Sequence, residues 1–245
     1  MERHCEYHPG APAIAICTVC EEDICASCHH SALTGYAVCA SCQQSVVDAL
    51  ATRWEQADRV RDLPYAFLHT VVAALSSPRN FFARVRPEGG WVRPLALGLI
   101  CMEIGTMVGN AWAYLFVDSF GEVMKQYAEA MQTSVDQAVP MFFLNLPFVV
   151  PLVFALHLGL LHVSLKLMGA RTRWSATARI VGFSSAAFIL QIVPPIADFS
   201  LGHLLAIIWM FNLEINAVQQ HYRMGFLRTL GAVLGPFLIV LLFSV

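Results

Sequence analysis

Charged side chains are scarce in this 245-residue chain: 13% of its residues are Asp, Glu, Lys or Arg, and 57% are hydrophobic. Soluble domains carry roughly 25% charged residues, so the deficit indicates a membrane protein. The formal net charge of −2 gives no overall basic character that would point to nucleic acid. The opening sequence MERHCEYHPG has no apolar stretch and no small-residue cleavage site, so no secretory signal peptide is predicted.

The apolar residues are concentrated after about residue 90. Residues 1–90 contain seven of the eight cysteines, whereas residues 91–245 contain nearly all the long apolar runs. We therefore expect three parts: a cysteine-rich module over 1–43, an amphipathic helical linker over 44–92 and a membrane domain over 93–245. The arginines and aromatic residues of the linker favour a helix in the headgroup layer of anionic lipid. The alternative is a linker that packs on the membrane domain.

Five apolar segments are candidates for spanning the bilayer, which takes about 20 mostly apolar residues. They are 94–117, 141–167, 178–194, 202–217 and 226–245. Pro147 and Pro151 lie inside the second segment and predict a kink rather than two separate spans. The prediction is an all-α integral membrane bundle of five transmembrane helices.

The charges between these segments predict the orientation of the bundle. Every connecting Lys and Arg except Lys125 falls on one side of a five-span arrangement. The first connection is instead acidic, with Asp118, Glu122, Glu129 and Asp136. By the positive-inside rule, the N-terminus is cytoplasmic and the C-terminus lies outside. We expect an integral membrane protein.

The cysteines before the membrane domain form pairs with metal-ligand spacing. One C-x2-H pair is followed by three C-x2-C pairs. Tetrahedral zinc takes four such ligands, so eight ligands predict two Zn²⁺ ions in closed, structural sites. The short gap between Cys20 and Cys25 favours an interleaved pairing, although a sequential pairing stays open. In the interleaved pairing, one zinc is bound by Cys5, His8, Cys25 and Cys28, and the other by Cys17, Cys20, Cys39 and Cys42.

Two further properties of this module bear on its role. Disulfides are the alternative to zinc, but a reducing cytoplasm disfavours them. Residues 1–43 carry five acidic side chains against Arg3 alone. Phosphate backbones require a Lys/Arg surface, so we expect the module to bind a cytoplasmic protein that the sequence does not name, and not nucleic acid.

Cys5-x2-His8-Pro9, followed by three C-x2-C pairs, resembles a B-box-type zinc finger. Such fingers bind two zinc ions in an interleaved manner and mediate protein contacts. Cys39 and Cys42 stand where B-boxes usually have histidines. The resemblance therefore implies a small irregular zinc-finger domain in front of the membrane bundle.

From about residue 77 the chain resembles the Yip family of Rab-interacting membrane proteins, in its bacterial form. The similarity lies in SPRNFFARVRPEGGWVRPLALG, GARTRWSATARIVGFSSAAFIL and IIWMFNLEINAVQQHYRM. It implies five spans and a cytoplasmic N-terminus. Eukaryotic members act in vesicle traffic with small GTPases, and we do not carry that role over.

Ionisable residues inside the apolar segments suggest a second function. By residue counting, Glu103 and His157 share one depth, and Glu214 and His162 share another. Such pairs could form the path of a small ion or metal transporter, or hydrogen-bonded contacts between helices.

No P-loop and no H-E-x-x-H motif occurs, and residues 182–186 only faintly resemble the serine motif of intramembrane proteases. We therefore expect no enzyme, and an intramembrane hydrolase is the least favoured reading. The preferred function is a zinc-binding membrane scaffold or adaptor, with the transporter as the alternative. The sequence leaves the oligomeric state open, a homo-oligomer included.

Overall fold

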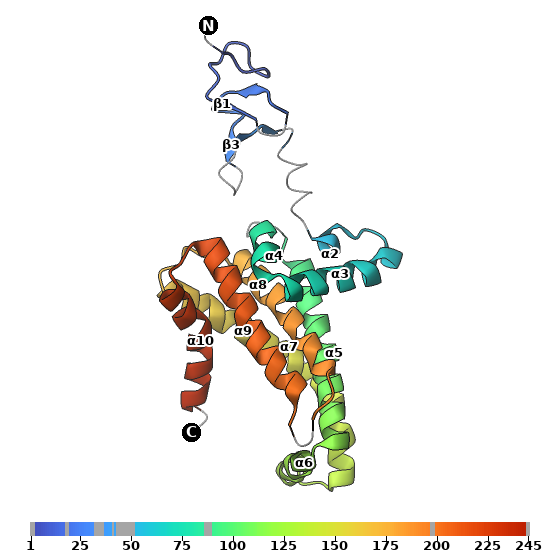
Figure 1. Cartoon of the computed structure of the whole chain (residues 1–245). Coiled ribbons are helices and arrows are strands. Elements are labelled where there is room, and N and C mark those ends of the chain that lie inside the picture. Colours follow the sequence, from blue (N-terminus) through green and yellow to red (C-terminus); the bar gives the residue numbers. More distant parts are fainter. Residues whose placement is uncertain are drawn as a thin grey trace. The chain divides into compact units, whose positions relative to one another are not determined.

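The computed structural model describes residues 3–17, 20–31, 37–40, 42, 52–85, 90–196 and 199–243 (Figure 1). Contacts divide the chain into two units. The first consists of Met1–Thr52 with Arg84–Arg86, and the second of Arg53–Ala83 with Pro87–Val245. The cysteine pairs lie in the first unit and the apolar helices in the second.

The first unit contains two short antiparallel hairpins. Strand β1 (Ala15–Ile16) pairs with β2 (Asp23–Ile24), and β3 (His30–Ser31) pairs with β4 (Ala37–Val38). Its buried core is formed by Ile24 and five cysteines, namely Cys5, Cys17, Cys25, Cys28 and Cys39. Among the described residues of this unit, the core contains one large aliphatic side chain, which cannot by itself offset the conformational entropy lost on folding. The unit therefore needs another source of folding energy, and its cysteines are placed to supply it.

The second unit is helical. Short helices come first: α2 (Arg53–Gln56), the 3₁₀ helix η1 (Val60–Asp62), α3 (Leu63–Ser76) and α4 (Pro78–Arg84). Then follow α5 (Val92–Phe116), α6 (Asp118–Ala130), α7 (Val135–Leu167), α8 (Trp174–Ser184), which continues as the 3₁₀ helix η2 (Ser185–Ile192), α9 (Leu201–Tyr222) and α10 (Phe226–Phe243).

Four of these elements are long and apolar enough to cross a membrane: α5, α7, α8 with η2, and α9. The prediction of a mostly helical membrane protein is thereby confirmed. The fifth predicted span corresponds to α10, whose apolar part within the searched residues, Phe226–Phe237, is shorter than the other four.

The starts of two spans differ most from the sequence prediction. Helix α7 begins at Val135 and continues through Pro140, Pro147 and Pro151, whereas the predicted segment began at residue 141. Helix α8 begins at Trp174, whereas the predicted segment began at residue 178, so Arg179 lies in the second turn of the helix rather than at its start. A lone charge in lipid is costly, but Arg179 is buried and donates to Glu55 of α2 and to the Gly90 carbonyl. The ion pair with α2 explains why the charge is tolerated.

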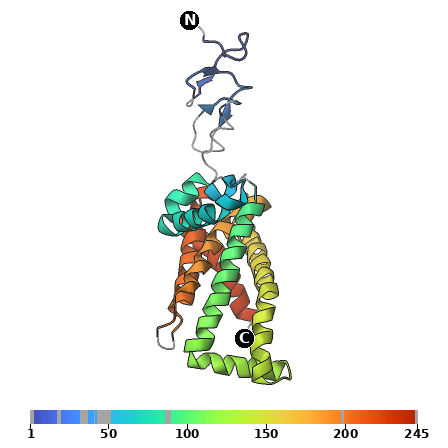
Figure 2. The ribbon, with the colours of Figure 1, turned by 90° about the vertical axis from the view of Figure 1, so that its right-hand side faces the viewer.

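The sequence also did not predict α6. This helix lies across the ends of α5 and α7 (Figure 1, Figure 2). Phe120, Met124 and Ala128 are buried at a four-residue spacing, so one stripe of the helix packs inward. The acidic loop expected between the first two spans is therefore an amphipathic helix.

Close backbone contact joins α5 to α8 and η2. A Cβ atom on Gly98 would lie 2.3 Å from the Gly182 carbonyl oxygen, and one on Gly105 would lie 2.0 Å from the Phe188 carbonyl oxygen. A Cβ on Gly182 would lie 2.4 Å from the carbonyl carbon of Pro94. Small residues allow such an approach between helices in lipid, where packing replaces the hydrophobic effect as the driving force.

We predict that Gly98→Ala and Gly105→Ala each destabilise the helical unit by about 1–3 kcal/mol, because the added methyl group must push a backbone segment away. Thermal unfolding in detergent measures the effect. Gly159→Ala in α7 is the matched control, since its Cβ would meet no atom within 4 Å. Equal stability of the Gly98→Ala and Gly159→Ala proteins would contradict the contact.

Candidate functional site

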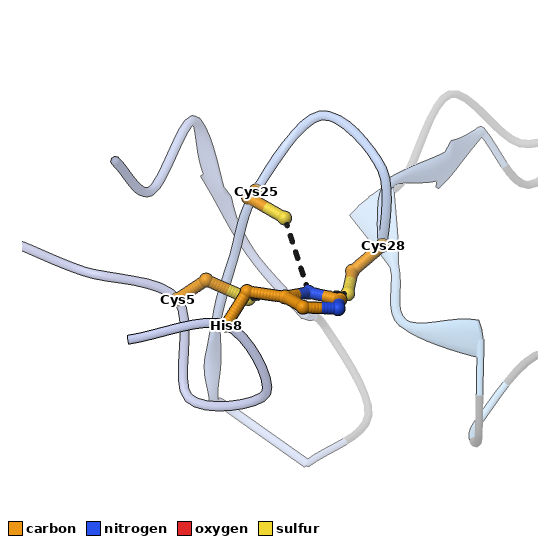
Figure 3. A group of neighbouring side chains, drawn as sticks. All are labelled: Cys5, His8, Cys25 and Cys28. Atoms are coloured by element: carbon orange, nitrogen blue, oxygen red, sulfur yellow. Dashed lines mark hydrogen bonds between the residues drawn. The ribbon is translucent and has the colours of Figure 1, made fainter. Parts of the chain in front are cut away.

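The first group of candidate metal ligands comprises Cys5, His8, Cys25 and Cys28, whose ligand atoms all lie within 4.8 Å of one another. The four side chains converge on one point (Figure 3). The sulfurs of Cys5 and Cys28 are 3.9 Å apart. Nδ1 of His8 lies 3.2 Å from the Cys28 sulfur and 3.6 Å from the Cys25 sulfur.

The second group comprises Cys17, Cys20, Cys39 and Cys42, again with all ligand atoms within 4.8 Å. The sulfurs of Cys20 and Cys39 are 3.8 Å apart. The backbone amide of Cys39 donates to the Cys17 sulfur at 3.3 Å, and that of Cys42 donates to the Cys39 sulfur at 3.4 Å. Such amide donors stabilise the negative charge of a thiolate.

The β1–β2 hairpin explains this grouping of the ligands. Cys17 and Cys20 lie in the connection from β1 to β2, whereas Cys25 follows β2 at the other end of the hairpin. Neighbouring pairs in the sequence are therefore separated by the length of the hairpin. The first Cys/His pair therefore lies beside the third pair, and the second pair lies beside the fourth. This is the interleaved pairing.

Both groups have the dimensions of a four-coordinate metal site. A tetrahedral ion with metal–sulfur bonds of about 2.3 Å and metal–nitrogen bonds of about 2.0 Å separates two sulfurs by about 3.8 Å, and sulfur from nitrogen by about 3.5 Å. The two sulfur–sulfur distances given above are 3.8 and 3.9 Å, and the two sulfur–nitrogen distances are 3.2 and 3.6 Å, all close to these values. All eight cysteines of the chain are free thiols, so no disulfide competes. Each cluster could bind one metal ion, and four protein ligands would leave no open position for a substrate.

The thiols of the first group differ in acidity. The Ser27 hydroxyl lies 3.0 Å from the Cys25 sulfur and lowers the pKa of Cys25 to about 6. Burial, followed by the neighbouring thiols, raises the pKa of Cys28 to about 11. A metal ion that binds here must therefore displace the proton of Cys28. Sequence analysis missed Ser27, although its position between Cys25 and Cys28 was a usable signal.

The four ionisable residues of the membrane segments do not form the two pairs that were predicted. His157 on α7 and Glu214 on α9 are joined instead, with 2.6 Å between Nε2 and Oε1. His162 shares a hydrogen bond of 2.9 Å with the Thr177 hydroxyl. No ion pair joins Glu103 to a histidine within the described segments. The predicted pairings of Glu103 with His157 and of Glu214 with His162 are wrong.

The error comes from the length of α9. The predicted span ended at residue 217, but the helix continues to Tyr222. At 1.5 Å per residue, Glu214 lies about 12 Å from the end of α9, and His157 lies about 15 Å from the end of α7. The extra residues of α9 bring Glu214 to the depth of His157.

The His157–Glu214 pair lies among three helices. Glu214 is fully buried, and His157 is largely buried against the Phe237 ring of α10, with 5.5 Å between the ring centroids. The second carboxylate oxygen of Glu214 has no hydrogen-bond partner among the described residues. The hydroxyl of Ser184, in the protease-like stretch, likewise has none among them, so the structure shows no serine–histidine pair at that position.

Comparison with known families bears on the helical unit. The Yip1 domain family matches residues 72–245, from the middle of α3 to the end of α10. The chain belongs to the Yip1 domain family. The match confirms the Yip resemblance seen in the sequence, and it leaves the cysteine-rich unit outside the Yip1 domain. The family is not enzymatic, which agrees with the expectation of a non-enzyme. No curated protein and no solved structure matches the chain.

We predict that the purified full-length protein contains two metal ions per chain, as measured by elemental analysis. Cys25→Ser should lower the content to about one ion, because it removes one of four ligands from a single closed site. Cys101→Ser is the control, since Cys101 is a buried packing residue of α5. A wild-type content of one or zero would contradict the two-site geometry.

Proposed function

We propose that this Yip1-domain protein is an integral membrane adaptor whose zinc finger faces the cytoplasm and binds another protein. The observation that carries the proposal is the pair of closed four-ligand clusters in a unit whose described residues form almost no other core. Closed metal sites stabilise a fold and leave its surface free for recognition.

The surface of the finger supports a protein partner. Tyr7, Ile14 and Ile16 are large apolar side chains that are 45–60% exposed. Ile14 and Ile16 are two residues apart in extended backbone, so they project from the same side. The acidic side chains Glu6 and Glu21 are exposed on the same unit. Exposed apolar and exposed acidic side chains on one small unit favour a protein partner that carries basic residues, and they disfavour nucleic acid.

Zinc is the metal that the ligands favour, because a thiolate-rich tetrahedral set suits Zn²⁺. Cys5, His8, Cys25 and Cys28 would bind one ion, and the second group would bind the other. The C-x2-H-P start supports a B-box-like finger over residues 1–43, followed by the 44–92 linker and the 93–245 membrane domain.

The topology we propose has five spans, with α10 as the fifth. Phe226–Phe243 is 18 residues long, or about 27 Å at the helical rise. The arginine distribution supports a cytoplasmic finger, and with an odd number of spans the C-terminus would then lie outside. A bacterial inner membrane is the proposed location.

We predict that Ile14→Ser/Ile16→Ser abolishes cross-linking between the full-length protein and its cytoplasmic partner in intact cells, because it removes the apolar patch. Mass spectrometry of the cross-linked products measures the loss. Val123→Ser/Met131→Ser is the matched control, with side chains of similar exposure on or beside α6. A partner that cross-links equally to both variants would contradict the proposed recognition surface.

The His157–Glu214 pair supports a small ion or metal transporter as a second candidate function. A fully buried carboxylate with one free oxygen is a binding group for a proton or cation in a membrane. His157 and Glu214 lie at one depth, and two groups at a single depth do not form a continuous path across the membrane. The transporter function therefore ranks below the adaptor.

We predict for this candidate that Glu214→Gln stops ion flux in proteoliposomes, since the neutral amide cannot exchange a proton or hold a cation. A pH-sensitive dye inside the vesicles measures the flux. Glu103→Gln is the control, because Glu103 is a second carboxyl group in a span. Absence of flux in the wild type, or unchanged flux in Glu214→Gln, would leave the pair as a contact between helices and end the transporter hypothesis.

A further inference from the structure

An open cleft of about 510 Å³ lies at the N-terminal end of α3. We call it the arginine cleft, because Arg53, Arg59 and Arg61 line it together with Tyr65. All three arginines are exposed. Arg53 donates to the Tyr65 hydroxyl at 3.2 Å and lies over its ring, with 5.3 Å to the ring centroid. Tyr65 thus holds one guanidinium group in the cleft.

The positive charge of the cleft exceeds the negative charge that is available to neutralise it. Asp58 and Asp62 also line the cleft, but Asp58 interacts with Arg93, and Asp62 interacts with Arg61, each at 3.7 Å. Within the described part of the chain, no carboxylate forms an ion pair with Arg53 or Arg59. Two guanidinium groups are therefore available for an anion.

An apolar stripe begins at the cleft and continues along α3. Tyr65, Leu68 and Val72 are 53–61% exposed and lie within one face of the helix. The opposite face, with Ala66, Thr70, Val71 and Ala74, is buried. An exposed apolar stripe next to a cationic cleft has the chemistry of a surface for a phospholipid: the cleft suits the headgroup and the stripe suits the acyl chains.

The position of α3 in the helical unit fits the edge of a bilayer. The side chain of Arg93, in the first turn of α5, donates to the carbonyls of Glu55 and Ala57 at 2.8 Å. Trp54 Nε1 donates back to the Arg93 carbonyl at 2.6 Å. The cleft is thereby fixed to the start of the first span, and α3 lies beside that end of the bundle (Figure 1, Figure 2). The start of a span is at the depth of the headgroups.

We propose that the arginine cleft and the α3 stripe bind one anionic phospholipid, with its phosphate on Arg53 and Arg59 and its acyl chains along Leu68 and Val72. Guanidinium groups bind phosphate through two parallel hydrogen bonds, which favours arginine for this task. In the proposed topology this end of the bundle faces the cytoplasmic leaflet, where anionic lipids attract basic segments. The site is independent of the finger and its partner.

Lipid retention by the full-length protein tests the proposal. The protein is placed in nanodiscs with equal amounts of phosphatidylglycerol and phosphatidylcholine, and native mass spectrometry counts the lipids that stay bound. The wild type should retain phosphatidylglycerol. Arg53→Gln/Arg59→Gln should lose that retention by at least about tenfold, since it removes the charge-assisted hydrogen bonds of two guanidinium groups to one phosphate, each worth at least about a tenfold gain in binding. Arg171→Gln/Arg173→Gln, two exposed arginines after α7, is the matched control and should behave as the wild type.

Two further arms separate the lipid from other occupants. Leu68→Ser/Val72→Ser should also reduce phosphatidylglycerol retention, and an excess of inorganic phosphate should leave the wild-type lipid bound. Displacement by phosphate, with no effect of the stripe variant, would assign the cleft to a small free anion and overturn the proposal. Dissociation of a dimer by the stripe variant, with lipid retention unchanged, would assign the stripe to a second copy of the chain and overturn it too. Equal phosphatidylglycerol retention by the Arg53→Gln/Arg59→Gln variant and the wild type would also overturn the proposal.

Discussion

A backbone amide or carbonyl inside a bilayer has no water to bind, and most features of the helical unit follow from this constraint. Each of the four elements in the described residues that are long and apolar enough to cross the membrane is helical, so most of its backbone groups are satisfied within the segment. Where a helix ends, a side chain supplies a partner: Trp112 Nε1 donates to the carbonyl of Ile192, the last residue of η2, at 3.0 Å. Trp209 Nε1 likewise donates to the Leu75 carbonyl near the end of α3.

The same constraint applies to the charges. Arg179 and Glu214 are both buried in the helical unit, and each has an ionisable partner from a distant part of the chain. Removal of one partner of such a pair leaves an uncompensated charge, which is far more costly than the pair itself. Arg179 fixes α2 to α8, and Glu214 fixes α9 to α7, so the two pairs connect α2, α7 and α9, which the glycine contacts between α5 and α8 with η2 do not involve. In the finger, Ile24 is the one large aliphatic core residue among those described, and we propose that the clustered sulfur and nitrogen ligands have the corresponding role.

Local patterns allowed much of this architecture to be predicted from the sequence. Apolar length predicted the four candidate spans, and the two-residue spacing of Cys and His predicted where metal ligands gather, because both properties depend on residues that are near one another in the chain.

The prediction failed where the decisive interaction partner of a residue was distant in the sequence. The partner of Arg179 was not predicted because Glu55, which neutralises it, is 124 residues away. The partner of His157 was misassigned because it depended on where α9 ends, and helix ends are set by packing as well as by sequence. Helix α6 was missed because its acidic residues indicated an exposed connection, and the buried stripe of this helix is short.

The central proposal is that the apolar spans and the placement of the arginines put the finger and the connection after α7 in the cytoplasm, and the α6 connection outside. Labelling with a membrane-impermeant maleimide tests it most directly, with Asp136→Cys at the start of α7 and Arg171→Cys after its end. The account predicts that Asp136→Cys reacts in intact cells, whereas Arg171→Cys and the finger cysteines of metal-depleted protein react only after the membrane is permeabilised. Reaction of Asp136→Cys and the finger cysteines from the same side of the membrane would contradict it.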